Sequence, residues 1–253
     1  VGKTLTGIKF FRENLRFPIP VKVLKKEILD KRIKAIRRKG KYLLFQTSAG
    51  DMILHLGMSG RVVQYFSDKP EQKHTHVIFR MGENVWLHFI DPRRFGCLVW
   101  QYNGEEHELL RYQGPDPYSP KANAKLMKQA AQRCKGSIKS FLMNGQRIAG
   151  IGNIYACESL FKAQINPNRP ANRLSLKSWD RILSEVRETF DRSIAAGGTT
   201  LNDFFDPYGS VGYYVQQLLV YGKEGEPCPE CKAPVCRTKH SGRSTFFCKL
   251  CQR

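Results

Sequence analysis

Four cysteines near the carboxyl end of the chain have the spacing of a metal site. They form two Cys-x-x-Cys pairs, Cys228 with Cys231 and Cys248 with Cys251, and sixteen residues separate the pairs. Each pair can supply two thiolates from a tight turn, and four thiolates so arranged suit one tetrahedral Zn²⁺ ion. Two disulfides or four unconnected thiols are the alternatives, but the doubled spacing favours a structural zinc site.

The segment between the cysteine pairs has the pattern of a β-hairpin. Residues 233–240 and 244–247 read as short strands, and 241–242 (Ser-Gly) reads as their turn, which places Arg243 at the tip. So short a segment cannot bury enough apolar surface to fold alone, so we expect the metal to act as its core. Cys236 lies inside the hairpin and is a possible rival ligand, although it breaks the paired pattern.

The charge balance predicts the class of molecule that the protein binds. The chain has 42 Lys and Arg residues against 22 Asp and Glu, a formal net charge of +20, and a pI near 9.8. That excess points to a polyanion, with nucleic acid as the first candidate. An anionic membrane surface is the second, but no basic amphipathic helix or lipidation signal supports it. The third reading is a protein that is merely basic.

Length and composition predict a soluble two-domain chain with an added zinc unit. With 253 residues, 41% of them apolar, the chain can build more than one core. No apolar run approaches membrane-spanning length, and the amino terminus does not resemble a secretory signal. Cysteines outside the two pairs are scattered without pairing logic, which fits a reducing cytosol.

The first part of the chain reads as a β-rich domain of short strands and turns. The expected strands are residues 4–11, 42–45, 77–81 and 85–90, and residues 52–60 read as a strand followed by a turn. Seven of the eleven residues from 31 to 41 are basic, and most should form a solvated face. Lys41 differs from these because it follows a glycine and precedes a buried-looking strand. It therefore lies at the edge of a strand, where its amine can have a defined direction.

Three further groups in this part carry chemistry. By themselves His55 and Met58 would be a hydrogen-bonded core histidine and a core filler. Residues 74–76 (His-Thr-His) begin a strand, which is expected to place both histidine rings on one face of it. Two histidines could bind a metal ion, but no third ligand is obvious. In the turn Asp91-Pro-Arg-Arg-Phe-Gly96, an arginine beside an aromatic ring is either a wedge for a base stack or an ordinary stacked surface pair.

The second part of the chain has a helical pattern. Three prolines within residues 114–120 predict the linker. The expected helices are 122–134, 137–143, 153–161 and 178–196, the last with one apolar stripe and two glycines at its end. Residues 206–212 read as a turn-rich loop and 213–221 as a strand leading into the zinc unit.

Asn153 marks the sharpest signal of the helical part. It follows two glycines in Gly150-Ile-Gly-Asn-Ile-Tyr155, and we expect it to cap the next helix. Free amide groups at a helix start can bind a phosphate, although a plain cap with nothing bound is the safer reading of this motif alone.

Together these motifs resemble one family, the bacterial formamidopyrimidine-DNA glycosylases. The resemblance runs from end to end and rests on four motifs beside the four cysteines: His55-Leu-Gly-Met-Ser-Gly60, Asp91-Pro-Arg-Arg-Phe-Gly96, Gly150-Ile-Gly-Asn-Ile-Tyr155 and Tyr221-Gly-Lys-Glu-Gly-Glu-Pro-Cys228. Endonuclease VIII is the nearest related family, but the Asp-Pro-Arg-Arg-Phe-Gly turn favours the formamidopyrimidine branch.

The resemblance implies an α+β fold and a bifunctional repair enzyme acting on duplex DNA. The implied domains are a β-sandwich at 1–113 without its first helix, the linker at 114–120, a helix-two-turn-helix domain at 121–221 and a zinc finger at 222–253. Such an enzyme flips an oxidised purine or acts at an abasic site, cuts the glycosidic bond and nicks the strand by β,δ-elimination. A monomer in the bacterial cytoplasm, associated with the nucleoid, is implied.

The resemblance also implies residue roles for phosphate binding and catalysis. Lys41 would lie near the reacting sugar and assist elimination. Arg243 would grip the phosphates beside the lesion and act as the general acid of δ-elimination. Asn153 and His55 would hold the same phosphates.

Further implied contacts serve the DNA backbone and the gap left by the flipped nucleotide. His74 and Lys135 would bind the backbone. Met58, Arg93 and Phe95 would enter the gap, since flipping costs a few kcal/mol that inserted side chains and phosphate clamps must offset.

One departure from the family concerns its nucleophile, the amine of an N-terminal proline followed by glutamate. The sequence begins Val1-Gly-Lys-Thr4, which matches the family just after its first helix. We expect that Val1 does not substitute and that the chain as printed has little or no glycosylase activity. It is either an incomplete copy of an active enzyme, which the intact remainder favours, or a natural short form that only binds DNA.

Two other functional classes compete with the repair enzyme. One is a binding protein that recognises lesions or abasic sites without chemistry. The other is a zinc-ribbon protein of translation or transcription, which the motifs at 91–96 and 150–155 disfavour.

Overall fold

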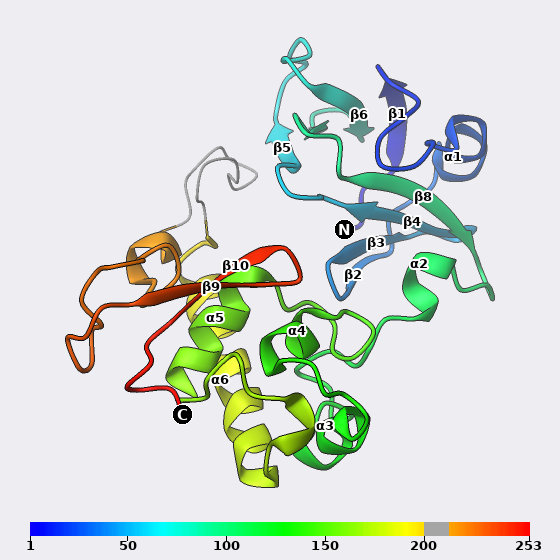
Figure 1. Ribbon diagram of the computed structural model, residues 1–253. Coiled ribbons are helices and arrows are strands. Elements are labelled where there is room, and N and C mark those ends of the chain that lie inside the picture. Colours follow the sequence, from blue (N-terminus) through cyan, green and yellow to red (C-terminus); the bar gives the residue numbers. More distant parts are fainter. Residues whose placement is uncertain (200–212) are drawn as a thin grey trace. The chain divides into compact units, whose positions relative to one another are not determined.

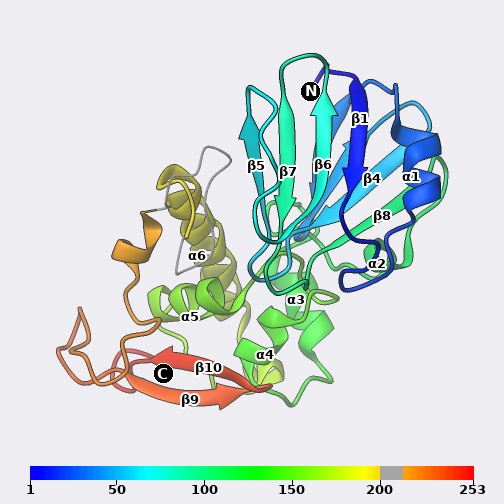
Figure 2. The ribbon, with the colours of Figure 1, turned by 90° about the horizontal axis from the view of Figure 1, so that it is seen from above.

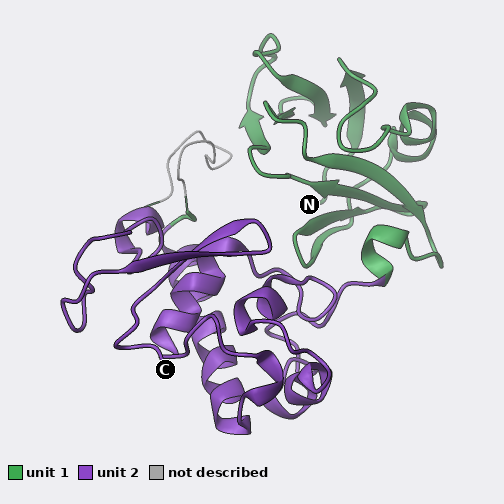
Figure 3. Ribbon diagram, in the orientation of Figure 1, with its two compact units in different colours: residues 1–111, 197–213 green, residues 112–196, 214–253 purple. Residues whose placement is uncertain are grey.

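The computed structural model describes residues 1–199 and 213–253, and these residues form two compact units. Unit 1 comprises Val1–Arg111 with the described residues of 197–213, and unit 2 comprises Tyr112–Ala196 with Tyr214–Arg253 (Figure 3). The expected loop at 206–212 lies outside the described residues. In the two described stretches, no helix combines the length and apolar character needed to cross a membrane.

Unit 1 is a sandwich of two four-stranded antiparallel sheets, as predicted (Figure 2). The first sheet has the order β1-β6-β7-β5, built from β1 Leu5–Phe10, β6 Thr75–Met81, β7 Trp86–Ile90 and β5 Arg61–Tyr65. The second has the order β2-β3-β4-β8, built from β2 Ala35–Lys39, β3 Tyr42–Gln46, β4 Gly50–His55 and β8 Cys97–Tyr102.

Side chains that alternate along these strands fill the core between the sheets. Phe79 and Phe89 enter it from the first sheet, and Met52, Leu54 and Leu98 enter it from the second. The strand period of two sends every other residue inward. The opposite face of the second sheet carries a smaller apolar cluster of its own.

Two helices of unit 1 were not predicted: α1 Val21–Ile28 and α2 Glu108–Arg111 (Figure 1). In α1, Val21, Leu24 and Ile28 have helical spacing, and the last two are fully buried in the sandwich core. Its lysines interrupt the apolar pattern, which hid that spacing in a basic stretch of the sequence. The four residues of α2 are too few to show a period.

Unit 2 contains the predicted helices around a separate core. They are α3 Ala124–Ala131, α4 Ile138–Met143, α5 Asn153–Lys162 and α6 Leu176–Ala195, with a short 3₁₀ turn, η1 Ala171–Arg173, between the last two. Within this core the rings of Phe141 and Trp179 pack edge to face, with their centroids 5.1 Å apart. The segment expected as a linker, 114–120, belongs to unit 2, where the Ala149 amide donates to the Pro115 carbonyl (3.0 Å).

Local sequence signals account for the ends of these helices. Ser137 caps α4 and Ser175 caps α6, each through a side-chain oxygen that accepts a backbone N–H three residues ahead. Helix α6 ends at Ala195, and Gly197, which follows the cap residue Ala196, has a left-handed φ of +73°. That conformation suits glycine and stops the helix where the glycine pair predicted.

The prediction of a strand at 213–221 is wrong. The segment forms a 3₁₀ helix, η2 Tyr214–Gln217, followed by turns. The buried carboxylate of Glu158 accepts the backbone N–H groups of Leu219 (2.8 Å), Val220 (3.0 Å) and Tyr221 (2.8 Å). These donors therefore cannot enter a strand ladder.

The predicted hairpin is present as β9 Cys236–His240 paired with β10 Arg243–Phe247. Its first strand begins later than expected, because Pro234 lacks an N–H and makes only an isolated bridge to Pro227. Phe246 and Val235 pack with Cys157 and Phe161 of α5, so the hairpin shares a small core with the helical part of unit 2.

Candidate nucleic-acid interface and metal centre

The four predicted cysteine ligands converge in unit 2. Their Sγ atoms all lie within 4.8 Å of one another, with 3.9 Å between Cys228 and Cys251 and 3.4 Å between Cys231 and Cys248. Four sulfurs around Zn²⁺ at about 2.3 Å lie about 3.8 Å apart, so the cluster fits one tetrahedral zinc ion. Cys236 is not part of the cluster, and its thiol lies against the Pro234 carbonyl (3.7 Å).

In unit 1, two loops are fastened to each other by a buried carboxylate. Asp91 is 0% exposed; its Oδ1 accepts from the Ser59 hydroxyl (2.8 Å) and its Oδ2 from the Gly96 N–H (2.8 Å). The Ser59 oxygen accepts in turn from the Arg93 N–H (3.2 Å). Asp91 therefore ties the loop after β4, residues 56–60, to the turn between β7 and β8.

The same two loops touch backbone to backbone. Gly57 has a φ of +71°, and a Cβ there would lie 2.5 Å from the Phe95 carbonyl carbon and the Gly96 nitrogen. Only glycine fits at such an approach. A Cβ on Gly96 would in turn lie 2.7 Å from the His55 carbonyl oxygen. The loops therefore form one rigid edge at this end of the sandwich.

Three predicted wedge residues lie on that edge. Met58 is 50% exposed and Phe95 44% exposed, although both are large apolar side chains. The Arg93 guanidinium lies 5.1 Å from the Phe95 ring centroid, a cation–π contact. Because Met58 is exposed, it does not fill the core. The stacked Arg93–Phe95 pair fits both a wedge for a base stack and an ordinary surface pair.

His55, the last residue of β4, is half-buried beside these loops. Its Nδ1 accepts the Gly57 N–H (2.9 Å), and its ring lies 4.8 Å from that of Tyr42. Burial, followed by the charges of Lys41 and Arg16, lowers the pKa of His55 to about 4. At neutral pH the ring is therefore uncharged and carries its proton on Nε2, as a hydrogen-bond donor.

Lys41 occupies the two-residue turn between β2 and β3, directly after Gly40. Lys39 pairs with Tyr42 at the ends of the two strands, which leaves Gly40 and Lys41 as the turn. Gly40 has the positive φ (+61°) that such a turn requires. Lys41 is exposed, and its influence on the pKa of His55 places its ammonium near that ring.

The two histidines of 74–76 do not share one environment, contrary to the prediction. His74 is exposed with a φ of +69° and precedes β6, so strand alternation does not apply to it. His76 is buried, and its Nε2 donates to the Asp91 carbonyl oxygen (2.8 Å). The His74 carbonyl accepts the Asp91 N–H (3.1 Å), which places His74 next to the fastened loops.

Asn153 is not the cap of α5, contrary to the prediction. Gly152 is the N-cap residue and Asn153 is the first helical residue. Its Nδ2 donates to the Ser244 carbonyl (3.0 Å) and to the Tyr221 hydroxyl (3.3 Å). Its side chain therefore joins the start of α5 to the hairpin and to the segment before the zinc site, which a single sequence position cannot reveal.

The other predicted residues of unit 2 are exposed. Arg243 is the first residue of β10, paired with His240, so it begins a strand directly after the turn. Lys135 lies in the loop between α3 and α4, which backbone hydrogen bonds join to residues 171–172. Through Ser244, the structure brings Asn153 next to the strand that carries Arg243.

Several residues of these sites were missed by sequence reasoning. Ser59 and Asp91 lie inside the quoted motifs but were given no role, since only the fold brings them together. Arg16 was not singled out; its N–H donates to the Gly96 carbonyl (3.1 Å), and its charge lowers the pKa of His55. No local pattern marks it, because it comes from an irregular segment.

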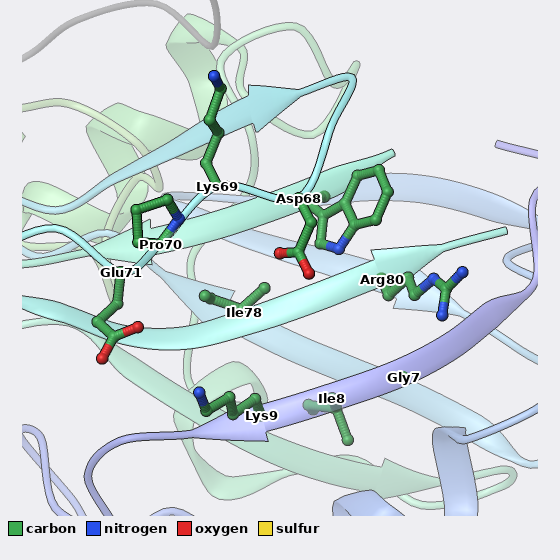
Figure 4. A pocket seen from close by; sticks show the side chains of 10 residues that line it. Gly7, Ile8, Lys9, Asp68, Lys69, Pro70, Glu71, Ile78 and Arg80 are labelled. Atoms are coloured by element: carbon green, nitrogen blue, oxygen red, sulfur yellow. The ribbon is translucent and has the colours of Figure 1, made fainter. Parts of the chain in front are cut away.

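Unit 1 also has an open hollow of about 560 Å³ over the first sheet (Figure 4). Ile78, Arg80 and Trp86 of the sheet line it, and Asp68 and Glu71 of the β5–β6 loop lie over those strands. None of the residues predicted from sequence lines this hollow. It is separate from the loops that Asp91 fastens.

Comparison with known families assigns most of the chain. Residues 1–98 match the formamidopyrimidine-DNA glycosylase N-terminal domain, and residues 113–205 match the formamidopyrimidine-DNA glycosylase H2TH domain. Residues 225–253 match a zinc finger found in FPG and IleRS.

Similar proteins and solved structures agree with these matches. The formamidopyrimidine-DNA glycosylase of Vibrio cholerae is 41% identical over 252 residues, which span 100% of this chain and 93% of that protein. That of Marinobacter nauticus is 40% identical with the same coverage. Lactococcus lactis Fpg, solved with DNA containing an abasic site, superposes with a TM-score of 0.89 at 30% identity, covering 100% and 93% of the two chains. The MutM (FPG) protein of Thermus thermophilus gives 0.86 at 34% identity, covering 100% and 92%.

Proposed function

Because the chain belongs to the formamidopyrimidine-DNA glycosylase family, we propose that it is a base-excision repair glycosylase that removes oxidised purines from duplex DNA. Its substrates are 8-oxoguanine and formamidopyrimidines, and after base removal it nicks the abasic strand by β,δ-elimination. The observation that carries this proposal is the rigid edge of unit 1, where Asp91 fastens two loops that expose Met58, Arg93 and Phe95.

The rigid edge suits a wedge that replaces an extruded nucleotide. Unstacking a base costs a few kcal/mol, and inserted apolar side chains recover part of that cost. A wedge acts only if its side chains are already in place, since ordering them on binding would add an entropy cost. The Asp91 hydrogen bonds and the close approach at Gly57 supply that order before DNA arrives.

Beside the wedge, unit 1 offers two kinds of phosphate ligand. His55 is uncharged and presents Nε2–H, which can donate to a phosphate oxygen without the cost of burying a cation. Lys41 supplies a full charge from a tight turn, and we assign it the role of assisting elimination near the reacting sugar. His74 adds a contact to the DNA backbone next to the same loops.

Unit 2 contributes the remaining contacts. We assign Arg243 to the phosphates beside the lesion and to the general acid step of δ-elimination. We assign Asn153 to a phosphate through its backbone N–H at the start of α5, and Lys135 to the DNA backbone. The exposed guanidinium of Arg243 and the hydrogen-bonded attachment of its strand to Asn153 support this assignment. The four cysteines would hold one Zn²⁺, which supplies a structural core to the hairpin.

The proposed partner and place in the cell follow from the substrate. The net charge of +20 suits chromosomal DNA, and we place the protein on the nucleoid of a bacterial cytoplasm. Binding through phosphate contacts predicts an affinity that falls steeply with salt.

Borohydride trapping tests the proposed chemistry. A duplex with one 8-oxoguanine is incubated with the chain as printed and with a version that carries a proline-first segment before Val1, and borohydride reduces any Schiff base to a stable covalent complex. We expect a trapped complex with the proline-first version and none with an undamaged duplex. Trapping by neither version would refute the enzyme. Binding of the lesion duplex without trapping would leave only a damage-recognition protein.

A further inference from the structure

We propose that helix α4 fixes the direction of the Arg243 side chain. Lys139 and Ser140 act as positioning residues, which hold the hairpin backbone on either side of Arg243. This inference rests on the proposed function, because it takes Arg243 to be a phosphate-binding cation. All the residues concerned lie in unit 2. The two α4 residues are adjacent in sequence; Ser140 reaches Ser241 of the turn, and Lys139 reaches Ser244 of β10.

Lys139 is a buried lysine with one defined acceptor. It is 0% exposed, and its Nζ donates to the Ser244 carbonyl oxygen at 3.2 Å. A buried ammonium is costly unless it is hydrogen-bonded, so a lysine at this position needs a structural reason. The proposed wedge and phosphate contacts do not use it. Its bond to the residue that directly follows Arg243 supplies that reason.

The Ser244 carbonyl receives a second donor. Asn153 Nδ2 lies 3.0 Å from the same oxygen, so donors from α4 and α5 fill both of its lone pairs. The carbonyl group of the residue directly after Arg243 is therefore fixed by donors from two helices. A fixed neighbour in the strand limits the directions in which the Arg243 side chain can leave it.

The other side of the turn is held through Ser241. Its Oγ lies 3.2 Å from the Oγ of Ser140, which in turn lies 3.0 Å from the Oγ of Ser137 at the start of α4. Ser241 and Gly242 both have positive φ, +49° and +74°, as a two-residue turn of this kind requires. Attachments at 241 and 244 thus bracket Arg243.

Electrostatics acts in the same direction. The pKa of Lys139 is lowered, mainly by burial, with a further contribution from the charge of Arg243. The two cations are therefore close enough to repel. Because Lys139 is fixed within the protein, this repulsion favours conformers in which the Arg243 guanidinium points away from α4 and towards solvent.

A double-mutant cycle on DNA affinity tests the proposal. The probe is a duplex with one tetrahydrofuran abasic analogue, and its fluorescence anisotropy is measured at fixed salt. We expect Lys139→Met to weaken binding about tenfold and Ser140→Ala two- to threefold, a coupling of the size found between neighbouring groups. In an Arg243→Ala background, Lys139→Met should change affinity less than about twofold.

Three companion variants keep the test decisive. Lys139→Arg restores a buried cation and should recover part of the affinity. Lys177→Met removes an exposed lysine of α6 and should leave affinity unchanged. If Lys139→Met does not fold, Ser140→Ala removes no charge from the core and carries the same cycle with Arg243→Ala, at smaller size.

Hydrogen exchange supplies a readout that does not depend on DNA. In Lys139→Met, amides of β9 and β10 should exchange at least several-fold faster than in the parent chain, while those of α6 should not change. Additive losses in the affinity cycle, or an unchanged hairpin with unchanged affinity, would overturn the positioning role alone. If the parent chain binds the abasic-analogue duplex no better than an undamaged one, the proposed function itself fails.

Discussion

Replacement of Asp91 by asparagine is a direct test of the rigid edge of unit 1. The fully buried carboxylate accepts one hydrogen bond on each oxygen, from Ser59 and from Gly96. Asparagine keeps one acceptor, which must face the Gly96 N–H because that group can only donate. Its NH₂ then faces the Ser59 hydroxyl, which already accepts from Arg93, so the hydroxyl proton loses its acceptor.

The cost can be worked from these contacts. A hydrogen bond to a charged group contributes about 1.5–3 kcal/mol, and a buried unsatisfied donor costs about 1–3 kcal/mol. Since the bond from Gly96 keeps its geometry without the charge and the Ser59 hydroxyl loses its acceptor, we expect Asp91→Asn to lower the free energy of unfolding of unit 1 by about 2–4 kcal/mol. Ser59→Ala, which leaves Asp91 Oδ1 without a partner, should cost about 1–3 kcal/mol.

The assay is urea unfolding with pulsed hydrogen exchange and mass spectrometry, which reads peptides of unit 1 apart from those of unit 2. Asp68→Asn is the matched control, because that carboxylate is exposed and forms no ion pair among residues 1–199 and 213–253. It should change stability by less than about 0.5 kcal/mol. Equal effects of Asp91→Asn and Asp68→Asn would refute the reasoning, as would additive losses in the Ser59→Ala, Asp91→Asn double variant.

Three further predictions concern protonation, the metal and the phosphate contacts. Because the pKa of His55 is about 4 when folded and 6.5 ordinarily, only the unfolded chain gains this proton as the pH falls from 6.5 towards 4. Stability should therefore fall across that window, and His55→Gln should flatten the pH dependence of urea unfolding; an unchanged slope would contradict the shifted pKa. Removing Zn²⁺ with a chelator should abolish exchange protection in β9 and β10 but not in α6, and retained hairpin protection would argue against a zinc core. Arg243→Ala should weaken binding of a lesion duplex much more than Arg181→Ala, an exposed arginine of α6, with a shallower salt dependence; equal losses in a titration would count against the assigned contact.

The sequence by itself determined the features that depend on neighbours along the chain. The zinc cluster is one, because each Cys-x-x-Cys turn presents two sulfurs through local geometry and only the hairpin must bring the turns together. Helix α6 is another, since its apolar stripe, its serine cap and its terminal glycines act within one segment. The exposure of Phe95 also followed from its proline turn, because turns carry their tips into solvent, whereas Met58 by itself read as a core filler and is exposed.

The tertiary structure decided the contacts between segments far apart in sequence. Asn153 has the residue type of a helix cap, but Gly152 is the N-cap, and the Asn153 NH₂ group donates to the Ser244 carbonyl and the Tyr221 hydroxyl, which only folding brings near. The strand expected at 213–221 is lost because a distant carboxylate, Glu158, takes the N–H groups that a ladder needs. Backbone and side-chain polar groups bind whichever partner the fold delivers, and that choice is made by packing rather than by local pattern.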